Sequence, residues 1–265
     1  MLGFIGCGTM GTALLEGIIR EGLRKPNEVA VFDQDKQKLE NLEKRHGVIV
    51  MPNASALCLK SETVFLAVKP QDMQNVLEEI KSDVTEHHVM ISVAAGLKLD
   101  FYQRLLGSDK KIIRVMPNTP CLIGKGMSVA SKGDVVSTED EQDVVTLLEA
   151  LGKVIVLDEK HMDTVTGLSG SGPAYALLFI ESLADGGVEM GLSRDVALLL
   201  AAQTVYGAAA LLLEKKENPT VLKNMITSPG GTTSAGLFAM EQGAVRASAI
   251  KAVIEASKRS QALGS

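Results

Sequence analysis

Three glycines near the start of the chain have the spacing of a phosphate-binding turn. Gly6, Gly8 and Gly11 form a GxGxxG pattern directly after a short apolar run, and Thr9 and Met10 open the helical pattern that follows. Glycine at these positions permits a tight turn and lets the backbone approach a pyrophosphate, which then lies at the positive end of the helix. The pattern predicts dinucleotide binding. The alternative is a glycine turn that only closes a strand-to-helix unit.

An acidic residue stands where the ribose of such a dinucleotide is expected. Asp33 ends the second predicted strand, 22 positions after Gly11. A carboxylate there accepts a hydrogen bond from the 2'-hydroxyl of NADH but repels the 2'-phosphate of NADPH. Lys36 and Lys38 lie close enough in sequence to offset that charge, or are solvated positions on a helix. The cofactor is therefore expected to be NADPH or NADH.

Three later segments each follow an apolar, β-branched run that predicts a strand. Ligands of an open α/β sheet bind outside the carboxyl ends of its strands, so these segments are expected to face the cofactor, with ordinary strand-end turns as the alternative. The residues placed at this edge are Ala67, Val68, Lys69, Pro70, Ala95, Gly96 and Asn118. Lys69 could meet a carboxylate or phosphate, while Pro70 removes a backbone donor and fixes its turn.

A second glycine-rich loop occurs in the last quarter of the chain. Gly230 and Gly231 lead into a helical pattern, and Ser228, Thr232 and Thr233 add hydroxyl groups around them. A helix that begins in this way presents several free N–H groups to an anion. The loop could hold a small carboxylate. Simple capping of the helix by Ser or Thr is the alternative.

No other group of residues has a spacing that indicates catalysis or metal binding. The histidines lack ligand spacing and are interpreted as surface residues; they are His46, His87, His88 and His161. Neither a Ser-His-Asp nor a Cys-His arrangement is evident. Cys7, inside the glycine turn, is interpreted as a small space-filling residue rather than a nucleophile.

The elements that must position these residues follow from hydrophobic periodicity. Short runs rich in Val and Ile alternate with amphipathic stretches, which is typical of strands and helices in a parallel sheet. Strands are expected at residues 2–6, 29–33, 48–51, 63–68, 88–94, 111–116, 126–131 and 153–157. Helices are expected at residues 10–22, 35–46, 71–81, 99–106 and 138–151. We predict an α/β fold with a Rossmann-like, doubly wound sheet over residues 1–158, which binds the dinucleotide.

The remainder, residues 159–265, is predicted to be an all-helical domain for dimerisation and substrate binding. It is rich in Ala, Leu and Met at helical spacing. Several stretches, notably residues 196–213, are apolar on more than one face, and such helices must be covered on more than one side. A helical domain of this size cannot supply that cover alone, so a homodimer or larger assembly is expected.

Composition excludes several classes of protein. With 265 residues, 46% of them hydrophobic, and a net charge of −5, the chain lacks the basic excess of a nucleic-acid binder, so no nucleic acid is expected as a partner. Three cysteines without a CxxC pair indicate neither a disulfide framework nor a zinc site. The chain opens directly on an apolar strand pattern, so we expect no export signal. We expect no membrane-spanning run either, on the interpretation that no uncharged stretch approaches the roughly 18 residues that a bilayer requires. The cysteine pattern favours a reduced, cytoplasmic location.

Several segments together resemble one enzyme family, the pyrroline-5-carboxylate reductases. The resemblance spans almost the whole chain and rests on the residues 3–11 (GFIGCGTMG), 67–70 (AVKP), 118–120 (NTP), 166–175 (TGLSGSGPAY), 184–187 (ADGG) and 228–233 (SPGGTT). The opening pattern is shared with β-hydroxyacid and 6-phosphogluconate dehydrogenases. The LSGSGPAY and SPGGTT segments are far more specific to the proline-forming enzymes.

The resemblance implies the final step of proline biosynthesis, an oxidoreductase reaction at a CH–NH group that uses NADPH or NADH. It implies chains that pair through their helical domains, often as dimers assembled into decamers. By the same resemblance, Ser228 and the backbone of Gly230, Gly231 and Thr232 hold the substrate carboxylate.

The resemblance assigns further contacts as well. It places Thr233 at the ring nitrogen of the substrate, and Asn53, Lys69 and Asn118 at the cofactor. One departure concerns the cofactor: many relatives have a small polar residue and Arg after the second strand, where this chain has Asp33 and Gln34. A strict preference for NADPH is therefore not expected.

Two other functions remain as alternatives. A dehydrogenase of a small hydroxy acid would share the first domain, but it needs a lysine acid/base on the helix around residues 166–174, where this chain has none. A dinucleotide-sensing protein without catalysis would have no use for the hydroxyl-lined loop at residues 228–233.

Overall fold

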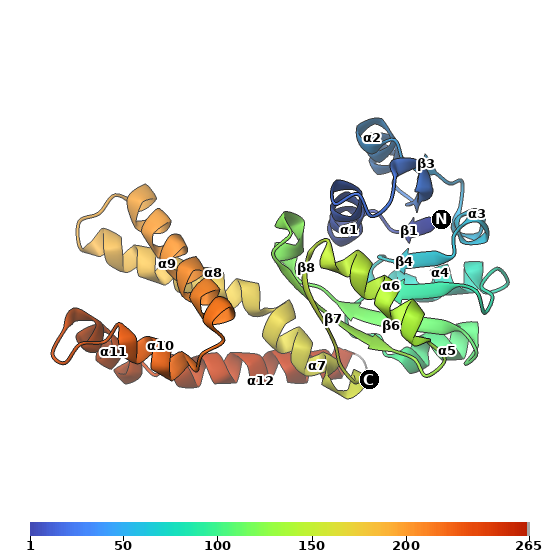
Figure 1. The fold of residues 1–265 in the computed structure, drawn as a ribbon. Coiled ribbons are helices and arrows are strands. Elements are labelled where there is room, and N and C mark those ends of the chain that lie inside the picture. The colour runs from blue at the N-terminus through green and yellow to red at the C-terminus, as the bar shows by residue number, and fades with distance from the viewer. Residues whose placement is uncertain (264–265) are drawn as a thin grey trace. The chain divides into compact units, whose positions relative to one another are not determined.

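The computed structural model describes residues 1–263, which form two compact units (Figure 1). Among the described residues, the first unit comprises Met1–Ser171 together with residues 255–263, and the second comprises Gly172–Ile254. The division thus falls between Ser171 and Gly172, later than the boundary expected after residue 158. The reason is that the short helices after the last strand pack against the sheet, and the end of the last helix returns to it.

An eight-stranded sheet organises the first unit. Its strands are β1 (Leu2–Ile5), β2 (Val29–Phe32), β3 (Ile49–Val50), β4 (Thr63–Leu66), β5 (Val89–Ser92), β6 (Lys111–Met116), β7 (Gly126–Lys132) and β8 (Gly152–Val156). They lie in the order β3-β2-β1-β4-β5-β6-β7-β8. Strands β1 to β3 follow one another toward one edge of the sheet, and β4 to β8 follow one another toward the other edge. The carboxyl ends of the parallel neighbours β1 and β4 therefore form the switch point, where ligands of such sheets bind.

Helices cover both faces of the sheet, as predicted. These are α1 (Thr9–Arg20), α2 (Lys36–His46), α3 (Ala54–Lys60), α4 (Pro70–Ile80), α5 (Leu99–Leu106) and α6 (Thr138–Glu149). One apolar core contains side chains from α1, α2 and α6, such as Leu14, Leu42 and Leu147. The other contains side chains from α3, α4 and α5, such as Leu57 and Leu77. The predicted doubly wound α/β fold is therefore confirmed.

Two local features of this unit differ from the expectations. Helix α3 was not predicted, because its 7 residues are too few to show an amphipathic period. Strand β7 extends the sheet as expected but runs antiparallel to β6, and β8 runs parallel to β7. Only the short 3₁₀ turn Thr119–Ile123 joins β6 to β7, and so short a connection cannot cross over the sheet to give a parallel neighbour.

Short helical turns lead from β8 out of the sheet. A 3₁₀ turn (Glu159–His161), α7 (Met162–Val165) and one π-helical turn (Thr166–Gly170) follow one another. Met162 and Val165 are buried against Val129 of β7. This packing holds residues 159–170 on the sheet as part of the first unit.

The second unit is entirely helical within the residues described. It contains α8 (Gly172–Glu189), α9 (Arg194–Lys215), α10 (Pro219–Met225), α11 (Thr232–Gln242) and most of α12 (Val245–Leu263). Small side chains let α8 and α9 approach closely: Ala184, Ala197 and Ala201 are buried together. Most large apolar side chains of this unit are exposed, including Leu199 at 70% and Phe238 at 66%. The unit does not form a sufficient core from its own residues.

The apolar run in α9 corrects one expectation. No membrane-spanning run was expected, yet α9 is long and apolar enough to cross a membrane by length and composition. Its residues 196–213 include no charged side chain. A helix that packs between subunits meets the same description, because its apolar side chains are covered by another chain instead of by lipid.

We expect a charge on the exposed face of α9 to prevent self-association. Leu199→Glu should lower the dimer affinity strongly, since covering one leucine contributes roughly 1.5–3 kcal/mol and a buried unpaired charge adds a further penalty. Light scattering at micromolar concentration should show a dimer or larger assembly for the wild type and a smaller species for the variant. Glu217→Lys, a charge change in the exposed loop after α9, is the matched control. A monodisperse, active wild-type monomer would contradict the expectation.

Candidate functional site

The glycine turn after β1 lies at the switch point of the sheet. Gly6 has φ +99°, and a Cβ built on it would lie 2.7 Å from the carbonyl carbon of Ala67 and 2.8 Å from the backbone nitrogen of Val68. A Cβ on Gly11 would collide with the carbonyl oxygen of Gly6. Both glycines are therefore required by the close approach of the turn to the end of β4 and to the start of α1.

Gly8 has no such packing reason. Its φ of −72° suits any residue, and a Cβ there would meet no atom of the described residues within 4 Å. Gly8 is the N-cap of α1, no side chain caps the helix, and its first turn carries no acidic residue. The N–H groups of Thr9, Met10 and Gly11 are thus available at the positive end of the helix, beside open space. This arrangement fits the pyrophosphate of a dinucleotide.

Asp33 lies beside the glycine turn, as predicted, and is already hydrogen-bonded there. Its Oδ2 accepts a hydrogen bond from the backbone nitrogen of Cys7 at 2.7 Å, and its Oδ1 accepts one from the nitrogen of Asp35 at 2.9 Å. The Nζ of Lys38 lies 4.0 Å from Oδ1. Because a carboxylate has about four acceptor sites, Asp33 can still accept a bond from a ribose hydroxyl. Its charge is partly offset by Lys38.

A cleft of about 230 Å³ brings several predicted residues together. It is lined by Ile5, Gly6, Gly8, Phe32, Asp33, Gln34, Lys38, Ala67, Val68, Lys69, Asp72, Val76 and Glu79. A second groove, of about 490 Å³, shares Phe32, Asp33 and Gln34 and is also lined by Lys36. The two hollows flank Asp33, which is the arrangement that a ribose between a pyrophosphate and a base requires.

The cleft is also lined by three residues of α4 that were not predicted from the sequence, two of them acidic. Asp72, Val76 and Glu79 all line it from α4. Their spacing of i, i+4 and i+7 places them on one face of a helix, so helical periodicity after Pro70 could have identified them. Glu79 also accepts a hydrogen bond from the backbone nitrogen of Ala54 at 3.1 Å, which joins α3 to α4.

Other residues assigned to the cofactor have structural partners outside this cleft. Asn53 is the N-cap of α3 and accepts from the backbone nitrogen of Ala56 at 2.7 Å. The amide of Asn118 donates to the carbonyl of Ser169 at 3.0 Å and accepts from the nitrogen of Met127 at 2.9 Å, so it joins β7 to the π-helical turn. Their contact with a cofactor stays a prediction.

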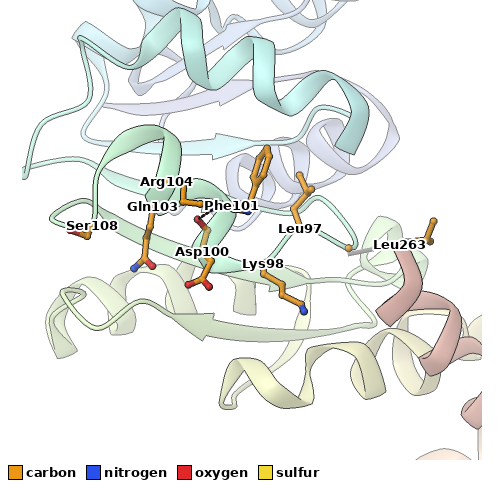
Figure 2. Close-up of a pocket in the computed structure, with 9 residues that line it drawn as sticks. Leu97, Lys98, Asp100, Phe101, Gln103, Arg104, Ser108 and Leu263 are labelled. Carbon is orange, nitrogen blue, oxygen red and sulfur yellow. Dashed lines mark hydrogen bonds between the residues drawn. The ribbon is translucent and has the colours of Figure 1, made fainter. Parts of the chain in front are cut away.

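The remaining predicted positions lie at strand ends. Pro70 is the first residue of α4, and Lys69 is its N-cap. Ala95 is exposed on the loop after β5, and Gly96 has φ +81° there. Gly96 lines a separate groove, of about 620 Å³, next to α5 (Figure 2).

The Cys7 thiol is not a nucleophile in this environment. Burial, followed by the nearby Asp33 carboxylate, raises the pKa of Cys7 to about 12, against a smaller lowering by Lys38. The thiol therefore stays protonated at neutral pH, and only the thiolate is strongly nucleophilic. This agrees with the interpretation of Cys7 as a space-filling residue.

The glycine-rich loop of the helical unit ends at an uncapped helix. Gly230 has φ +68°, the backbone nitrogen of Gly231 donates to the carbonyl of Ser228 at 3.1 Å, and Gly231 is the N-cap of α11. No side chain caps α11, so simple capping by Ser or Thr is not observed. Thr232 is exposed and Thr233 is half-buried on the first turn. Free N–H groups and hydroxyls together suit a carboxylate.

Comparison with known proteins supports both halves of this description. Residues 159–263 match the family model described as pyrroline-5-carboxylate reductase dimerisation, and residues 1–96 match that described as NADP oxidoreductase coenzyme F420-dependent. A pyrroline-5-carboxylate reductase of Arabidopsis thaliana is 43% identical over 99% of this chain and 95% of its own length. The chain belongs to the pyrroline-5-carboxylate reductase family. The resemblance found in the sequence is thereby confirmed.

Further members of the family show the same extent of similarity. The Escherichia coli pyrroline-5-carboxylate reductase is 39% identical over 99% of this chain and 97% of its own length. A solved Coxiella burnetii pyrroline-5-carboxylate reductase superposes with a TM-score of 0.94 at 33% identity, covering 100% of this chain and 98% of its own. A Plasmodium falciparum pyrroline carboxylate reductase, solved with NADP bound, gives 0.90 at 35% identity, with 100% and 98% covered.

Substitutions in the glycine turn should separate binding from folding. A methyl group at Gly8 meets no protein atom but fills the space beside α1, so Gly8→Ala should leave Tm unchanged and weaken dinucleotide binding roughly tenfold or more, a loss of about 1.4 kcal/mol. Gly11→Ala, the paired comparison, should lower Tm because its methyl group meets the Gly6 carbonyl. Thermal unfolding and calorimetric titration measure the two effects. Unchanged affinity in Gly8→Ala would mean that the pyrophosphate lies elsewhere.

Proposed function

We propose that this chain reduces L-1-pyrroline-5-carboxylate to L-proline with NADPH or NADH, the last step of proline biosynthesis. The proposal rests on one observation: this member of the family has two complementary features in the same chain. One is a dinucleotide cleft with open space at Gly8, and the other is an uncapped, hydroxyl-rich helix start at Gly231. An imino acid needs an anion-binding group and a hydrogen-bond donor, and this loop offers both.

The cleft would orient the dinucleotide through backbone contacts and through Asp33. The N–H groups at the start of α1 would bind the pyrophosphate, Asp33 would bind the ribose, and the loops after β4 and β5 would hold the nicotinamide end. The reduced nicotinamide supplies a hydride to the C=N carbon of the substrate when bound. Orientation of this kind can contribute several kcal/mol to lowering the barrier.

The loop at the start of α11 supplies the contacts to the substrate. Ser228 and the N–H groups of Gly230, Gly231 and Thr232 would hold its carboxylate, and the Thr233 hydroxyl would donate to its ring nitrogen. That nitrogen gains electron density as the hydride arrives, so a hydrogen bond there is stronger in the transition state. A threonine hydroxyl is too weak an acid to be the proton source at neutral pH. The proton comes from water or is already present on an iminium.

Self-association is part of this proposal. The helical unit matches a dimerisation family and exposes large apolar side chains such as Leu199. We propose that the active form is at least a dimer in the cytoplasm, with a decamer as the larger assembly and no membrane or nucleic acid as a partner. The cover that the apolar helices need would then come from a second copy of the chain.

Asp33 and Lys38 should set the cofactor preference in opposite directions. Asp33→Ser removes the charge that repels a 2'-phosphate and should raise the NADPH to NADH ratio of kcat/KM, whereas Lys38→Gln should lower it, each by roughly tenfold or less. Steady-state oxidation of both cofactors measures the ratio. Asp35→Asn is the control, because it removes a neighbouring charge yet can still cap α2. An unchanged ratio in a folded Asp33→Ser would show that Asp33 does not face the ribose.

Turnover with pyrroline-5-carboxylate tests the function, and Thr233 tests its mechanism. NADPH or NADH oxidation should depend on the imino acid. Thr233→Ala should lower kcat roughly ten- to a thousandfold, a loss of about 1.4 to 4 kcal/mol, because its contact strengthens in the transition state. Thr233→Ser should keep much of the activity, and Ser228→Ala should chiefly raise KM.

Two results of these assays would count against the proposal. No substrate-dependent oxidation with either cofactor would exclude the reductase activity and leave the dinucleotide-sensing alternative. Wild-type kcat and KM in Thr233→Ala would show that the hydroxyl takes no part in the reaction.

A further inference from the structure

The loop between β5 and α5 is fixed by hydrogen bonds at both of its ends. It carries Ala95 and Gly96, and Figure 2 shows Leu97 and Lys98 on it, just before Asp100 and Phe101 on α5. At its start, the backbone nitrogen of Val93 donates to the carbonyl of Leu66 at 3.2 Å. Leu66 ends β4, directly before the residues that line the cofactor cleft. The position of this loop is therefore tied to that cleft.

A carboxylate distant in sequence holds the other end of the loop. Glu159 accepts a hydrogen bond from the backbone nitrogen of Leu99, the first residue of α5, at 2.7 Å. The same Oε1 accepts from the Nη1 of Arg114 at 2.6 Å. The Arg114 side chain is only 7% exposed and that of Glu159 is 29% exposed. A buried guanidinium must keep its partner, so the pair fixes where α5 begins.

A buried hydroxyl pair lies next to this ion pair. Ser92 and Arg114 are paired in register on β5 and β6. The Ser92 hydroxyl lies 2.5 Å from that of Tyr102 and accepts a hydrogen bond from the backbone nitrogen of Ala94 at 3.3 Å. Burial raises the pKa of Tyr102 to about 12, so its hydroxyl stays protonated and can donate to Ser92. Tyr102 therefore fixes the hydroxyl of Ser92, which in turn holds the backbone of Ala94 at the start of the loop.

We infer that Glu159 and Arg114, together with Tyr102 and Ser92, are positioning residues that hold the β5–α5 loop against the nicotinamide end of the dinucleotide. None of them lines the cleft beside the glycine turn. They act on the cofactor through Ala94–Gly96 and not through the pyrophosphate site at Gly8. The consequence for catalysis rests on the proposed function, but the consequence for binding needs only a dinucleotide.

Binding of whole and truncated cofactors tests this inference. Calorimetry should compare the preferred dinucleotide with its matching fragment, ADP-ribose or 2'-phospho-ADP-ribose, which lacks the nicotinamide. Glu159→Ala should raise the Kd of the whole dinucleotide roughly fivefold or more. The Kd of the fragment should stay within about twofold of the wild-type value. Glu159→Gln, which keeps an oxygen for the Leu99 nitrogen, should recover part of the loss. With pyrroline-5-carboxylate, kcat of Glu159→Ala should fall roughly ten- to a hundredfold.

A neighbouring carboxylate provides the control. Asp158→Asn removes a charge from the same segment, but Asp158 forms its ion pair with Lys160, at 3.0 Å, and both side chains are at least 70% exposed. It should bind both ligands as the wild type does. If Glu159→Ala does not fold, Glu159→Gln and Tyr102→Phe test the positioning role instead. Each should weaken binding of the whole dinucleotide more than binding of its fragment.

The outcomes distinguish the inference from the proposed function. Equal weakening of both ligands, or no weakening of either, would overturn the positioning role. A wild-type protein that binds the dinucleotide but does not reduce pyrroline-5-carboxylate would overturn the proposed function alone. The positioning role would still be tested, because it depends on the affinity of each variant for the whole dinucleotide relative to the fragment.

Discussion

The contact between the Gly6 turn and the backbone after β4 is the constraint on which the site depends. A Cβ at Gly6 would come within 2.7 Å of the Ala67 carbonyl, so only glycine lets the ends of β1 and β4 lie this close. That approach aims the N-terminus of α1 at the carboxyl edge of the sheet. It also brings the residues after β4 into the lining of the same cleft. Asp33 completes the turn by accepting a hydrogen bond from Cys7.

Asp33 therefore serves the fold and the ligand at once. Its carboxylate satisfies two backbone N–H groups, at Cys7 and Asp35, before any ribose binds. A serine in its place would change the charge seen by a 2'-phosphate and also the support of the glycine turn. Cofactor preference in this chain is thus coupled to the geometry of the pyrophosphate site, and Lys38, 4.0 Å away, moderates the charge.

The helical unit is governed by a different constraint, the shortage of internal cover for its apolar side chains. Only small residues such as Ala184 and Ala197 are buried where α8 and α9 cross, while the leucines of α9 face outward. Local helix propensity can form these helices, but it cannot cover them. Residues 159–263 match a dimerisation family, and association with a second chain would supply the missing contact.

The sequence by itself determined the features that depend on local spacing. The GxGxxG turn, Asp33 at the end of β2, the alternation of strands and helices, and the glycine-rich start of α11 are all encoded within a few residues, so each could be predicted. So could the need of residues 196–213 for cover on several sides. The family followed from short segments of the same kind.

Only the tertiary structure decided what depends on residues distant in sequence. The bond from Asn118 to Ser169 and the pairing of Arg114 with Glu159 across 45 positions have no local pattern. Hydrogen bonds and ion pairs of this range form only when the packing of the sheet brings their strands and helices together. The sequence contains both partners of each contact, but the tertiary packing determines which of them come within bonding distance.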